Sequence, residues 1–272
     1  MITIQNDNFS LAQICQSGQC FRMTNYIDSK CSRYCLVAFG KYLEMAQEGN
    51  SVSLDCTQEE YDTLWRDYFD LETDYAGIIA GIDRNDAYLS AAAEYGKGIR
   101  ILHQDLWEML ISFIISQNNN IGRIRNSVRK LCSQYGEKRV AANGIIYYCF
   151  PTPEVLAGVS LEDLNACGLG YRSKYICQTA DSVCRGDIDL SKLRTMDYDT
   201  AKKELLKVYG IGAKVADCVC LFALHHTDAF PRDTHINKVM AEHYPDGFPF
   251  ARYGKVSGIL QQYIFYYDLN KK

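Results

Sequence analysis

One lysine, Lys214, occupies a position that suggests chemistry. It lies in the segment VYGIGAKVADC (residues 208–218), where Gly210 and Gly212 come just before a run of residues typical of a helix. The amino end of a helix is the positive end of its dipole, so a cation is unfavourable there. A neutral amine is favoured at the same place, and a neutral amine can attack an electrophilic carbon. Lys214 is therefore either an ordinary exposed side chain or a nucleophile.

A carboxylate further along the chain can assist such a nucleophile. The segment AFPRDTH (residues 229–235) contains Asp233, which follows Pro231, a residue that stiffens the loop. If this loop folds back over Lys214, the carboxylate can orient the amine and stabilise the positive charge that develops during a displacement. Asp233 can also be the N-cap of a following helix, and the two roles are compatible.

The two glycines predict a helix-hairpin-helix at about residues 199–225, with helices over 203–208 and 213–224. The amides at the start of the second helix then point outward and form an anion site. Such an element suits a DNA phosphate, which it holds without reading sequence. For the glycines taken alone, a plain turn between two packed helices is the alternative.

The sequence around these residues predicts an α+β fold, with a small antiparallel β domain followed by a larger all-helical region. Short segments rich in β-branched and aromatic residues predict strands at 34–39, 42–47 and 51–56. A capping box at 57–60 predicts a helix through Trp65. From about residue 78 the apolar spacing is helical. We place the β domain at residues 1–97 and the helical region at residues 98–272.

Composition and charge fit a soluble globular protein, with 272 residues of which 47% are hydrophobic and 23% charged. The amino terminus lacks a basic region followed by an apolar run, and no apolar stretch approaches the roughly 20 residues that span a bilayer. We therefore expect a cytoplasmic protein (nucleoid-associated if bacterial) without a membrane partner. The net charge of −4 argues against a generally basic protein but not against a local nucleic-acid surface.

Cysteines and histidines do not indicate a metal site in the sequence. The twelve cysteines are scattered and have no zinc-finger spacing, so we expect free thiols; the close pairs are Cys31 with Cys35 and Cys218 with Cys220. Three histidines are too unevenly spaced to suggest ligands: His225, His226 and His235.

With hairpin, lysine and aspartate together, the chain resembles the helix-hairpin-helix/Gly-Pro-Asp DNA glycosylases, and in detail their 8-oxoguanine DNA glycosylase branch. GIGAKVADCVCLFAL followed by AFPRDTH is similar to the catalytic segment of that family. Tyr209 stands where the family usually has a proline, which we expect to change loop stiffness and not chemistry. Four further segments resemble the family in the same order: SGQCFR (17–22), ISFIISQNNNIGRI (111–124), GLGYRSKY (168–175) and LQQYIFYYDL (260–269).

This resemblance implies an enzyme that flips 8-oxoguanine out of duplex DNA, excises it and nicks the abasic site by β-elimination. Lys214 would attack C1′ of the sugar and form a Schiff base, while Asp233 stabilises the developing charge. In the base pocket the Gly18 carbonyl would accept a hydrogen bond from the N7–H that only the oxidised base carries. Cys218 and Phe265 would sandwich the purine, with core packing as their alternative. Gln261 would bond its Watson–Crick edge.

The resemblance also implies contacts to the rest of the DNA. Four residues would contact the opposite base or wedge into the gap, which suggests a preference for lesions opposite cytosine: Asn118, Arg123, Tyr171 and Arg172. Phosphate contacts or exposed charges are the alternatives for the two arginines. Four residues would contact phosphate: Gly210, Gly212, Val215 and His235. We expect a monomer that needs no cofactor, with a monovalent or divalent ion at the hairpin as a further possibility of the resemblance.

Three other functions were weighed against this one. An alkylpurine glycosylase of the same superfamily uses the aspartate with water, and Lys214 argues against it. A pyrimidine-specific endonuclease commonly carries a C-terminal four-cysteine cluster, whereas no cysteine follows Cys220 here. A non-catalytic helix-hairpin-helix module would not need the Lys214–Asp233 pair.

Overall fold

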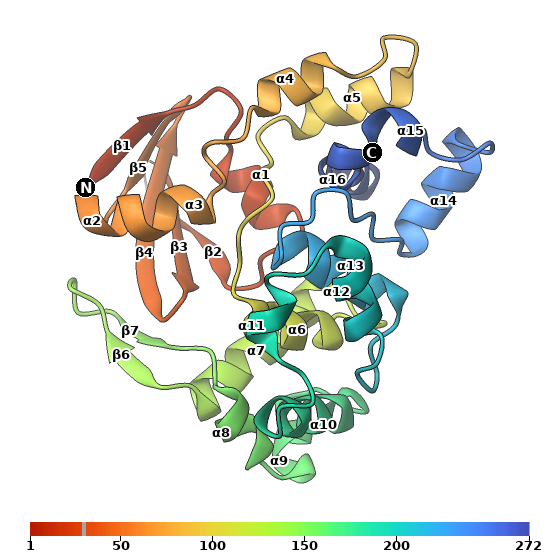
Figure 1. The fold of residues 1–272 in the computed structure, drawn as a ribbon. Coiled ribbons are helices and arrows are strands. Elements are labelled where there is room, and N and C mark those ends of the chain that lie inside the picture. Colours follow the sequence, from red (N-terminus) through yellow and green to blue (C-terminus); the bar gives the residue numbers. More distant parts are fainter. Residues whose placement is uncertain (29–30, 272) are drawn as a thin grey trace.

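A five-stranded antiparallel sheet forms the amino-terminal part of the molecule (Figure 1). The structure is a computed structural model that describes residues 1–28 and 31–271. The sheet has the order β1-β5-β4-β3-β2, and helix α1 (Leu11–Gln16) connects β1 to β2. The strands are β1 (Ile2–Gln5), β2 (Met23–Asp28), β3 (Cys31–Ala38), β4 (Lys41–Glu48) and β5 (Ser51–Leu54). The three predicted strands correspond to β3, β4 and β5, whereas β1 and β2 were not predicted individually.

One face of the sheet is covered by the helical segment that the capping box predicts. Thr57 Oγ1 accepts from the Glu60 amide at 3.1 Å, and the Glu60 carboxylate accepts from the Thr57 amide at 3.2 Å. The segment comprises α2 (Gln58–Glu60), a π-helical turn (Tyr61–Trp65) and α3 (Arg66–Tyr68), so it ends three residues later than predicted. Its buried aromatic residues pack with the sheet in a core separate from that of the helices.

The remaining helices build the larger body, and α6 lies at its centre with all ten residues buried. These helices are α4 (Tyr75–Ala80), α5 (Ala87–Gly96), α6 (Leu106–Ile115), α7 (Ile121–Tyr135), α8 (Pro153–Ala157), α9 (Leu161–Ala166), α10 (Arg172–Cys184), α11 (Leu190–Leu193), α12 (Tyr198–Leu205), α13 (Ala213–Phe222), α14 (Thr234–His243), α15 (Phe250–Tyr253) and α16 (Ser257–Asn270). Helix α5 packs against α16, so the helical body includes residues before position 98. The boundary between residues 97 and 98 stays a prediction.

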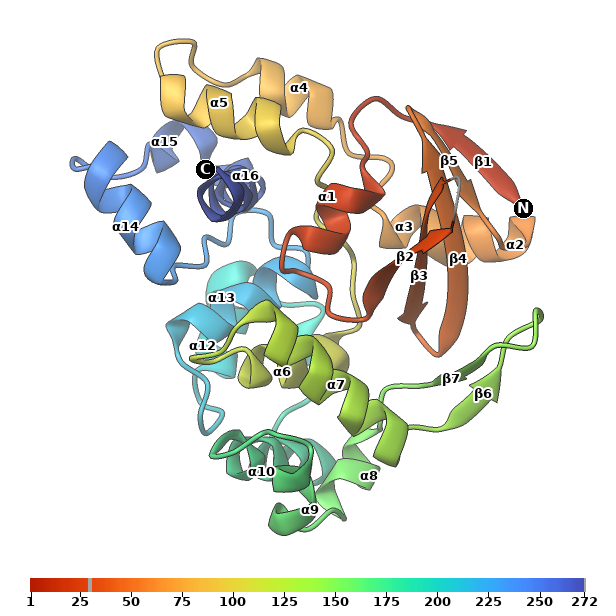
Figure 2. The same ribbon diagram turned by 180° about the vertical axis from the view of Figure 1, so that it is seen from behind.

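The region predicted as all helical also contains a two-stranded β-ribbon, which corrects that detail. Strands β6 (Lys138–Val140) and β7 (Ile146–Tyr148) pair antiparallel around a turn that contains Gly144, with φ of +84°. The β6–β7 ribbon lies close to the end of the sheet that carries the β3–β4 turn (Figure 2), where Arg139 and Tyr147 donate hydrogen bonds to the Gly40 carbonyl. Its residues are mostly exposed and lack the regular apolar alternation by which a half-buried strand is recognised.

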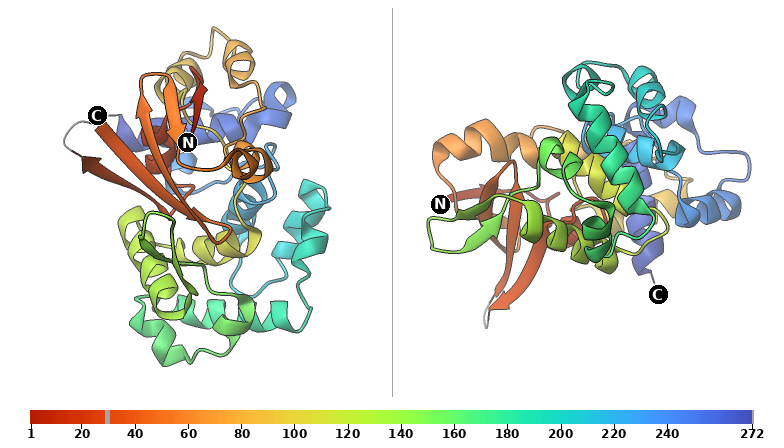
Figure 3. Two further views of the ribbon diagram at one scale, coloured as in Figure 1. Left: turned by 90° about the vertical axis from the view of Figure 1, so that its left-hand side faces the viewer. Right: turned by 90° about the horizontal axis from the view of Figure 1, so that it is seen from below.

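Segments from the beginning, middle and end of the chain meet between these parts. Helices α1, α13 and α16 gather near the middle of the molecule (Figure 1), and the sheet lies to one side of the helical body in the other views (Figure 3). None of the described helices combines the length and the hydropathy needed to cross a membrane. Each cysteine whose side chain is described is a free thiol; the side chain of Cys31 lies outside the described part.

Candidate active site

A small pocket forms where the amino end of α13, the loop before α14 and helix α16 meet the α1–β2 loop. We call it the lysine pocket. It has a volume of about 50 Å³ and is lined by Ser17, Gly18, Phe113, Lys214, Cys218, Phe222, Pro231, Asp233, Gln261, Gln262 and Phe265. All six residues predicted for catalysis and for the base pocket line it together. A water molecule occupies about 30 Å³ of liquid, and a purine is several times larger than water. The pocket volume of about 50 Å³ is therefore too small for a purine, so the pocket has to widen to admit one.

Lys214 lies in the first turn of α13, as predicted. The helix begins at Ala213, and Gly212 is its N-cap. Lys214 Nζ donates to Ser116 Oγ at 3.1 Å and lies 5.2 Å from the centre of the Phe113 ring. The sequence assigns no role to Ser116 or Phe113. The two residues lie about one helical turn apart in the segment ISFIISQNNNIGRI, which resembles a segment of the glycosylase family. The hydroxyl and the ring direct the amine into the pocket.

Asp233 has the local role that its position before a helix predicts. It is the N-cap of α14, and its Oδ1 accepts from the Ile236 amide at 2.9 Å. The same carboxylate lines the lysine pocket. A carboxylate held by a backbone amide keeps a fixed orientation, so Asp233 presents its charge to the pocket without a direct bond to Lys214.

The wall formed by Cys218 is neutral. Burial raises the pKa of the Cys218 thiol to about 11, against the opposing effect of the nearby Lys214 ammonium group. The thiol therefore stays protonated at neutral pH, and Cys218 contributes a polarisable surface for packing and not a second nucleophile.

Gly18 lies in the pocket wall at a position with little room for a side chain. Its φ is +76°, and an added Cβ would lie 3.2 Å from Phe265 and 3.4 Å from Ile121. Gln262 Nε2 donates to the Ser17 carbonyl at 2.5 Å, which fixes the loop next to Gly18. Gln262, which has no predicted role, lines the pocket together with Gln261.

Gln261 carries an unused hydrogen-bond acceptor. The side chain is 4% exposed, and its Nε2 donates to the Pro231 carbonyl at 3.1 Å. Its Oε1 is buried and has no hydrogen-bond partner among the described residues. Leaving a buried acceptor unpaired costs about 1–3 kcal/mol, so a ligand that donates to it recovers that free energy.

The two hairpin glycines have different roles. Gly210 has φ of +86°, and an added Cβ would lie 2.5 Å from the Tyr175 ring, so the fold itself requires a glycine there. Gly212 has φ of −96°, and no described atom lies within 4 Å of the Cβ it could carry. Gly212 has no side chain to accept from the first amides of α13, so these amides can bind an anion. Val215 is 2% exposed, so a phosphate contact from it would use its backbone amide and stays a prediction.

Three of the four residues predicted for the opposite strand lie at the start of α10, and the fourth, Arg123, lies in the first turn of α7. Asn118 and Arg123 are exposed, Tyr171 is 51% exposed, and Asn118 has φ of +47°. Arg172 is instead buried, and its guanidinium donates to the carbonyls of Gln117 (2.8 Å) and Asn118 (3.1 Å). Arg172 thus holds the loop that presents Asn118, and a contact from Arg172 to a base stays a prediction.

His235 lies beside the pocket, on α14. Its Nδ1 is 3.3 Å from Asp268 Oδ2, and its ring meets the Phe265 ring edge-on with centres 6.1 Å apart. His235 is half-exposed, which leaves its other nitrogen accessible for the predicted phosphate contact.

Two protein-family models match the chain. The family model described as "8-oxoguanine DNA glycosylase, N-terminal domain" matches residues 1–110, and the model described as "HhH-GPD superfamily base excision DNA repair protein" matches residues 111–247. The chain is 32% identical to an N-glycosylase/DNA lyase of Saccharomyces cerevisiae, over 89% of this chain and 70% of that protein. It is also 32% identical to a probable N-glycosylase/DNA lyase of Methanothermobacter thermautotrophicus, over 72% and 71%.

Solved structures are similar over almost the whole chain. The structure of MBOgg1 in complex with a low affinity DNA ligand has a TM-score of 0.91 at 36% identity, covering 98% of this chain and 94% of that one. The Clostridium acetobutylicum 8-oxoguanine glycosylase/lyase, in complex with double-stranded DNA containing cytosine opposite to 8-oxoG, has a TM-score of 0.88 at 35% identity, covering 98% and 97%. A 3-methyladenine DNA-glycosylase from Archaeoglobus fulgidus, with 19% identity and a TM-score of 0.76 over 99% of each chain, shares the fold.

The two hairpin glycines predict different outcomes when each is replaced by alanine. Gly210→Ala forces a side chain into a positive φ and into the Tyr175 ring, so we expect a loss of about 2–4 kcal/mol in the free energy of unfolding. Gly212→Ala meets neither obstacle and should change it by less than about 0.5 kcal/mol. Urea unfolding followed by circular dichroism measures both, and equal losses would contradict the different roles assigned to the two glycines.

Proposed function

The chain belongs to the HhH-GPD superfamily of base excision DNA repair proteins, and on this basis we propose that it excises 8-oxoguanine from duplex DNA and then nicks the abasic site. One observation carries the proposal: Lys214 lies at the amino end of a helix, in a pocket that it shares with Asp233 and with the unpaired oxygen of Gln261. The enzyme acts as a monomer in the cytoplasm (associated with the nucleoid if bacterial) and needs no cofactor. A monovalent or divalent ion at the hairpin carbonyls belongs to the same proposal.

Base recognition starts when the damaged nucleotide leaves the duplex, at a cost of a few kcal/mol. The base enters between Cys218 and Phe265 as the lysine pocket widens. The Gly18 carbonyl accepts from N7–H, a donor that guanine lacks, and Gln261 Oε1 accepts from the Watson–Crick edge. Unmodified guanine presents an acceptor at N7, which leaves the Gly18 carbonyl unpaired and facing a lone pair.

The chemistry then follows from the position of the amine. Neutral Lys214 Nζ attacks C1′, the bond from C1′ to N9 breaks, and the base leaves with the bonding electron pair. Asp233 stabilises the positive charge on the sugar during this step. Opening of the sugar ring gives a Schiff base between Nζ and C1′. Loss of a C2′ proton then expels the 3′ phosphate, and water releases the lysine.

The alternatives fit the pocket less well. An alkylpurine glycosylase that activates water with its aspartate has no use for a lysine that Ser116 and Phe113 direct into the pocket. A module that only grips DNA needs the hairpin but not a pocket built from α1–β2, α13 and α16.

Covalent trapping tests the role of Lys214. Wild-type protein, a duplex with one 8-oxoguanine and borohydride should give a stable protein–DNA adduct, because the reductant converts the Schiff base to an amine. Lys214→Gln should lower adduct formation by at least about 100-fold, since the nucleophile is gone. The adduct is measured by denaturing gel electrophoresis.

Lys207→Gln is the matched control, because Lys207 is exposed and pairs only with Glu204 on the surface near the hairpin. It should trap DNA as the wild type does. No adduct with wild type, or equal adduct with Lys214→Gln, would exclude the Schiff-base mechanism.

Gln261 separates base recognition from strand cleavage. Gln261→Met keeps the size of the side chain and removes the acceptor, so excision of 8-oxoguanine should lose about 1–3 kcal/mol of transition-state stabilisation, or about 5- to 150-fold in kcat/KM. Nicking of a duplex that already contains an abasic site should change by less than about threefold, because no base is bound. Equal losses on both substrates would show that Gln261 supports the fold of the pocket and not recognition.

The opposite base is tested with four duplexes that differ only there. We expect the fastest excision opposite cytosine, with Arg123 supplying the discrimination. Arg123→Ala should reduce the preference by about 1–3 kcal/mol, the usual contribution of a specific arginine–base contact. Arg129→Ala, at an exposed arginine on the same helix that bonds only to Asn126, should preserve it. Equal wild-type rates opposite all four bases would refute the preference.

A further inference from the structure

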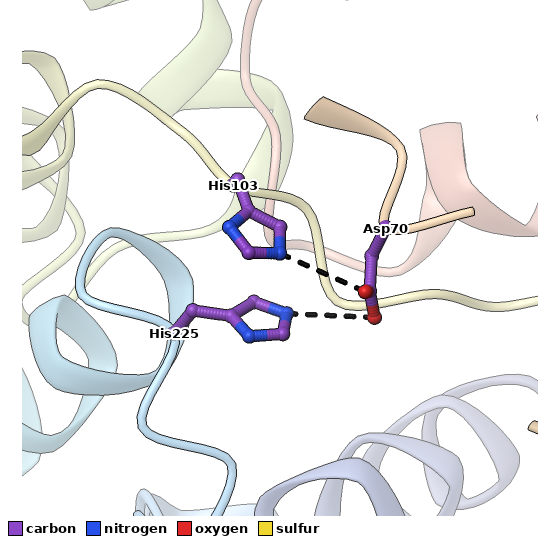
Figure 4. Close-up of side chains that lie close together, drawn as sticks. All are labelled: Asp70, His103 and His225. Atoms are coloured by element: carbon purple, nitrogen blue, oxygen red, sulfur yellow. Dashed lines mark ion pairs between the residues drawn. The ribbon is translucent and has the colours of Figure 1, made fainter. Parts of the chain in front are cut away.

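A cluster of two histidines and an aspartate lies outside the lysine pocket. Asp70 follows α3, His103 lies in the connection from α5 to α6, and His225 lies in the loop after α13 (Figure 4). Over residues 1–28 and 31–271, it is the one group of three such side chains whose ligand atoms all approach within 4.8 Å of one another. The sequence showed no sign of it, because the three residues are far apart along the chain.

The geometry is close to that of a metal site. His103 Nε2 is 3.7 Å from Asp70 Oδ1, and His225 Nε2 is 3.5 Å from Asp70 Oδ2. Zinc binds histidine nitrogen and carboxylate oxygen at about 2.0–2.2 Å, which in a tetrahedral site places neighbouring ligand atoms about 3.4 Å apart. The aspartate–histidine distances need to shorten by only a few tenths of an ångström.

The carboxylate also has the supporting hydrogen bonds that metal ligands usually have. Thr73 Oγ1 donates to Asp70 Oδ1 and Tyr75 Oη donates to Asp70 Oδ2, each at 2.7 Å. These two hydrogen bonds orient the Asp70 carboxylate toward the two histidines.

The outer nitrogen of His103 lies near a second carboxylate, beyond hydrogen-bond distance. His103 Nδ1 lies 3.9 Å from Asp67 Oδ2. A carboxylate at that position favours the tautomer whose Nε2 is free to bind a metal. The nearby Arg100 guanidinium lowers the affinity for a cation, but it donates to the backbone carbonyl of Asp70 and not to the carboxylate oxygens.

We propose that Asp70, His103 and His225 bind one divalent transition-metal ion, with Zn²⁺ favoured by two imidazoles and a carboxylate. The histidine side chains are 29% and 19% exposed, so the ion enters from solvent and keeps water as a further ligand. The ion ties together the end of α3, the connection to α6 and the loop that leads to Asp233. This site does not depend on the glycosylase activity.

Binding changes the arrangement of the two rings. They now stack with centres 3.6 Å apart and planes 18° apart. A metal ion lies in the plane of each imidazole that binds it, so the rings tilt out of their stack when the ion binds.

The test titrates Zn²⁺ into the chelator-treated, reduced full-length protein in competition with a chromophoric chelator. We expect one equivalent to bind to the wild type and to raise its Tm. His103→Gln and His225→Gln should each weaken binding by at least about tenfold and abolish the rise in Tm. His226→Gln changes the neighbouring residue, whose ring lies near Tyr198, and should bind as the wild type does.

Co²⁺ gives a second measurement that needs no variant. The cluster should show only weak visible bands, whereas a site built from cysteines adds intense thiolate charge-transfer bands in the near ultraviolet. Failure of the wild type to bind Zn²⁺, equal affinity in both histidine variants, or thiolate bands would each overturn the proposal.

Discussion

The close contact between Gly210 and the Tyr175 ring determines how the chain enters α13, and much of the site depends on that entry. The backbone turns at positive φ against a flat ring and then enters α13 at Gly212, which has no side chain to accept from the first amides of that helix. It also places Lys214 in the first turn of that helix, pointing into the pocket. The proposed anion site and the proposed nucleophile therefore both depend on the path of the backbone through Gly210. Asp217, one turn later, pairs with Lys202 at 2.7 Å and so attaches α13 to α12, which keeps this path rigid.

The lysine pocket combines this rigid part with a part that comes from the two ends of the chain. Ser17 and Gln262 are 245 positions apart and share a hydrogen bond that holds Gly18 next to Phe265. The residues proposed for catalysis belong to the rigid part, and the residues proposed to recognise the base belong mostly to the other. The pocket is small, so the interactions made by a base have to offset the free energy needed to widen it.

Local signals were enough to predict the hairpin, the capping box at Thr57 and the N-cap role of Asp233, because each depends on residues within a few positions of one another. The resemblance to a family then placed Gly18 and Gln261 in one pocket. Contacts between distant residues could not be predicted from local patterns. The burial of Arg172 under the Asn118 loop depends on how α10 packs. The β6–β7 ribbon is stabilised by Gly40 of the sheet. His103 and His225 stack because the fold brings the α5–α6 connection and the loop after α13 together.

Helix α16 is synthesised after the hairpin, and it carries Gln261, Gln262 and Phe265. A chain still in synthesis can therefore complete the hairpin and its lysine before it has the wall of the pocket that α16 provides, since domains fold from the amino end as they emerge. The order of the sequence thus sets an order of maturation. The lysine is in place first, and the proposed contacts from Gln261 and Phe265 to the damaged base follow when α16 docks.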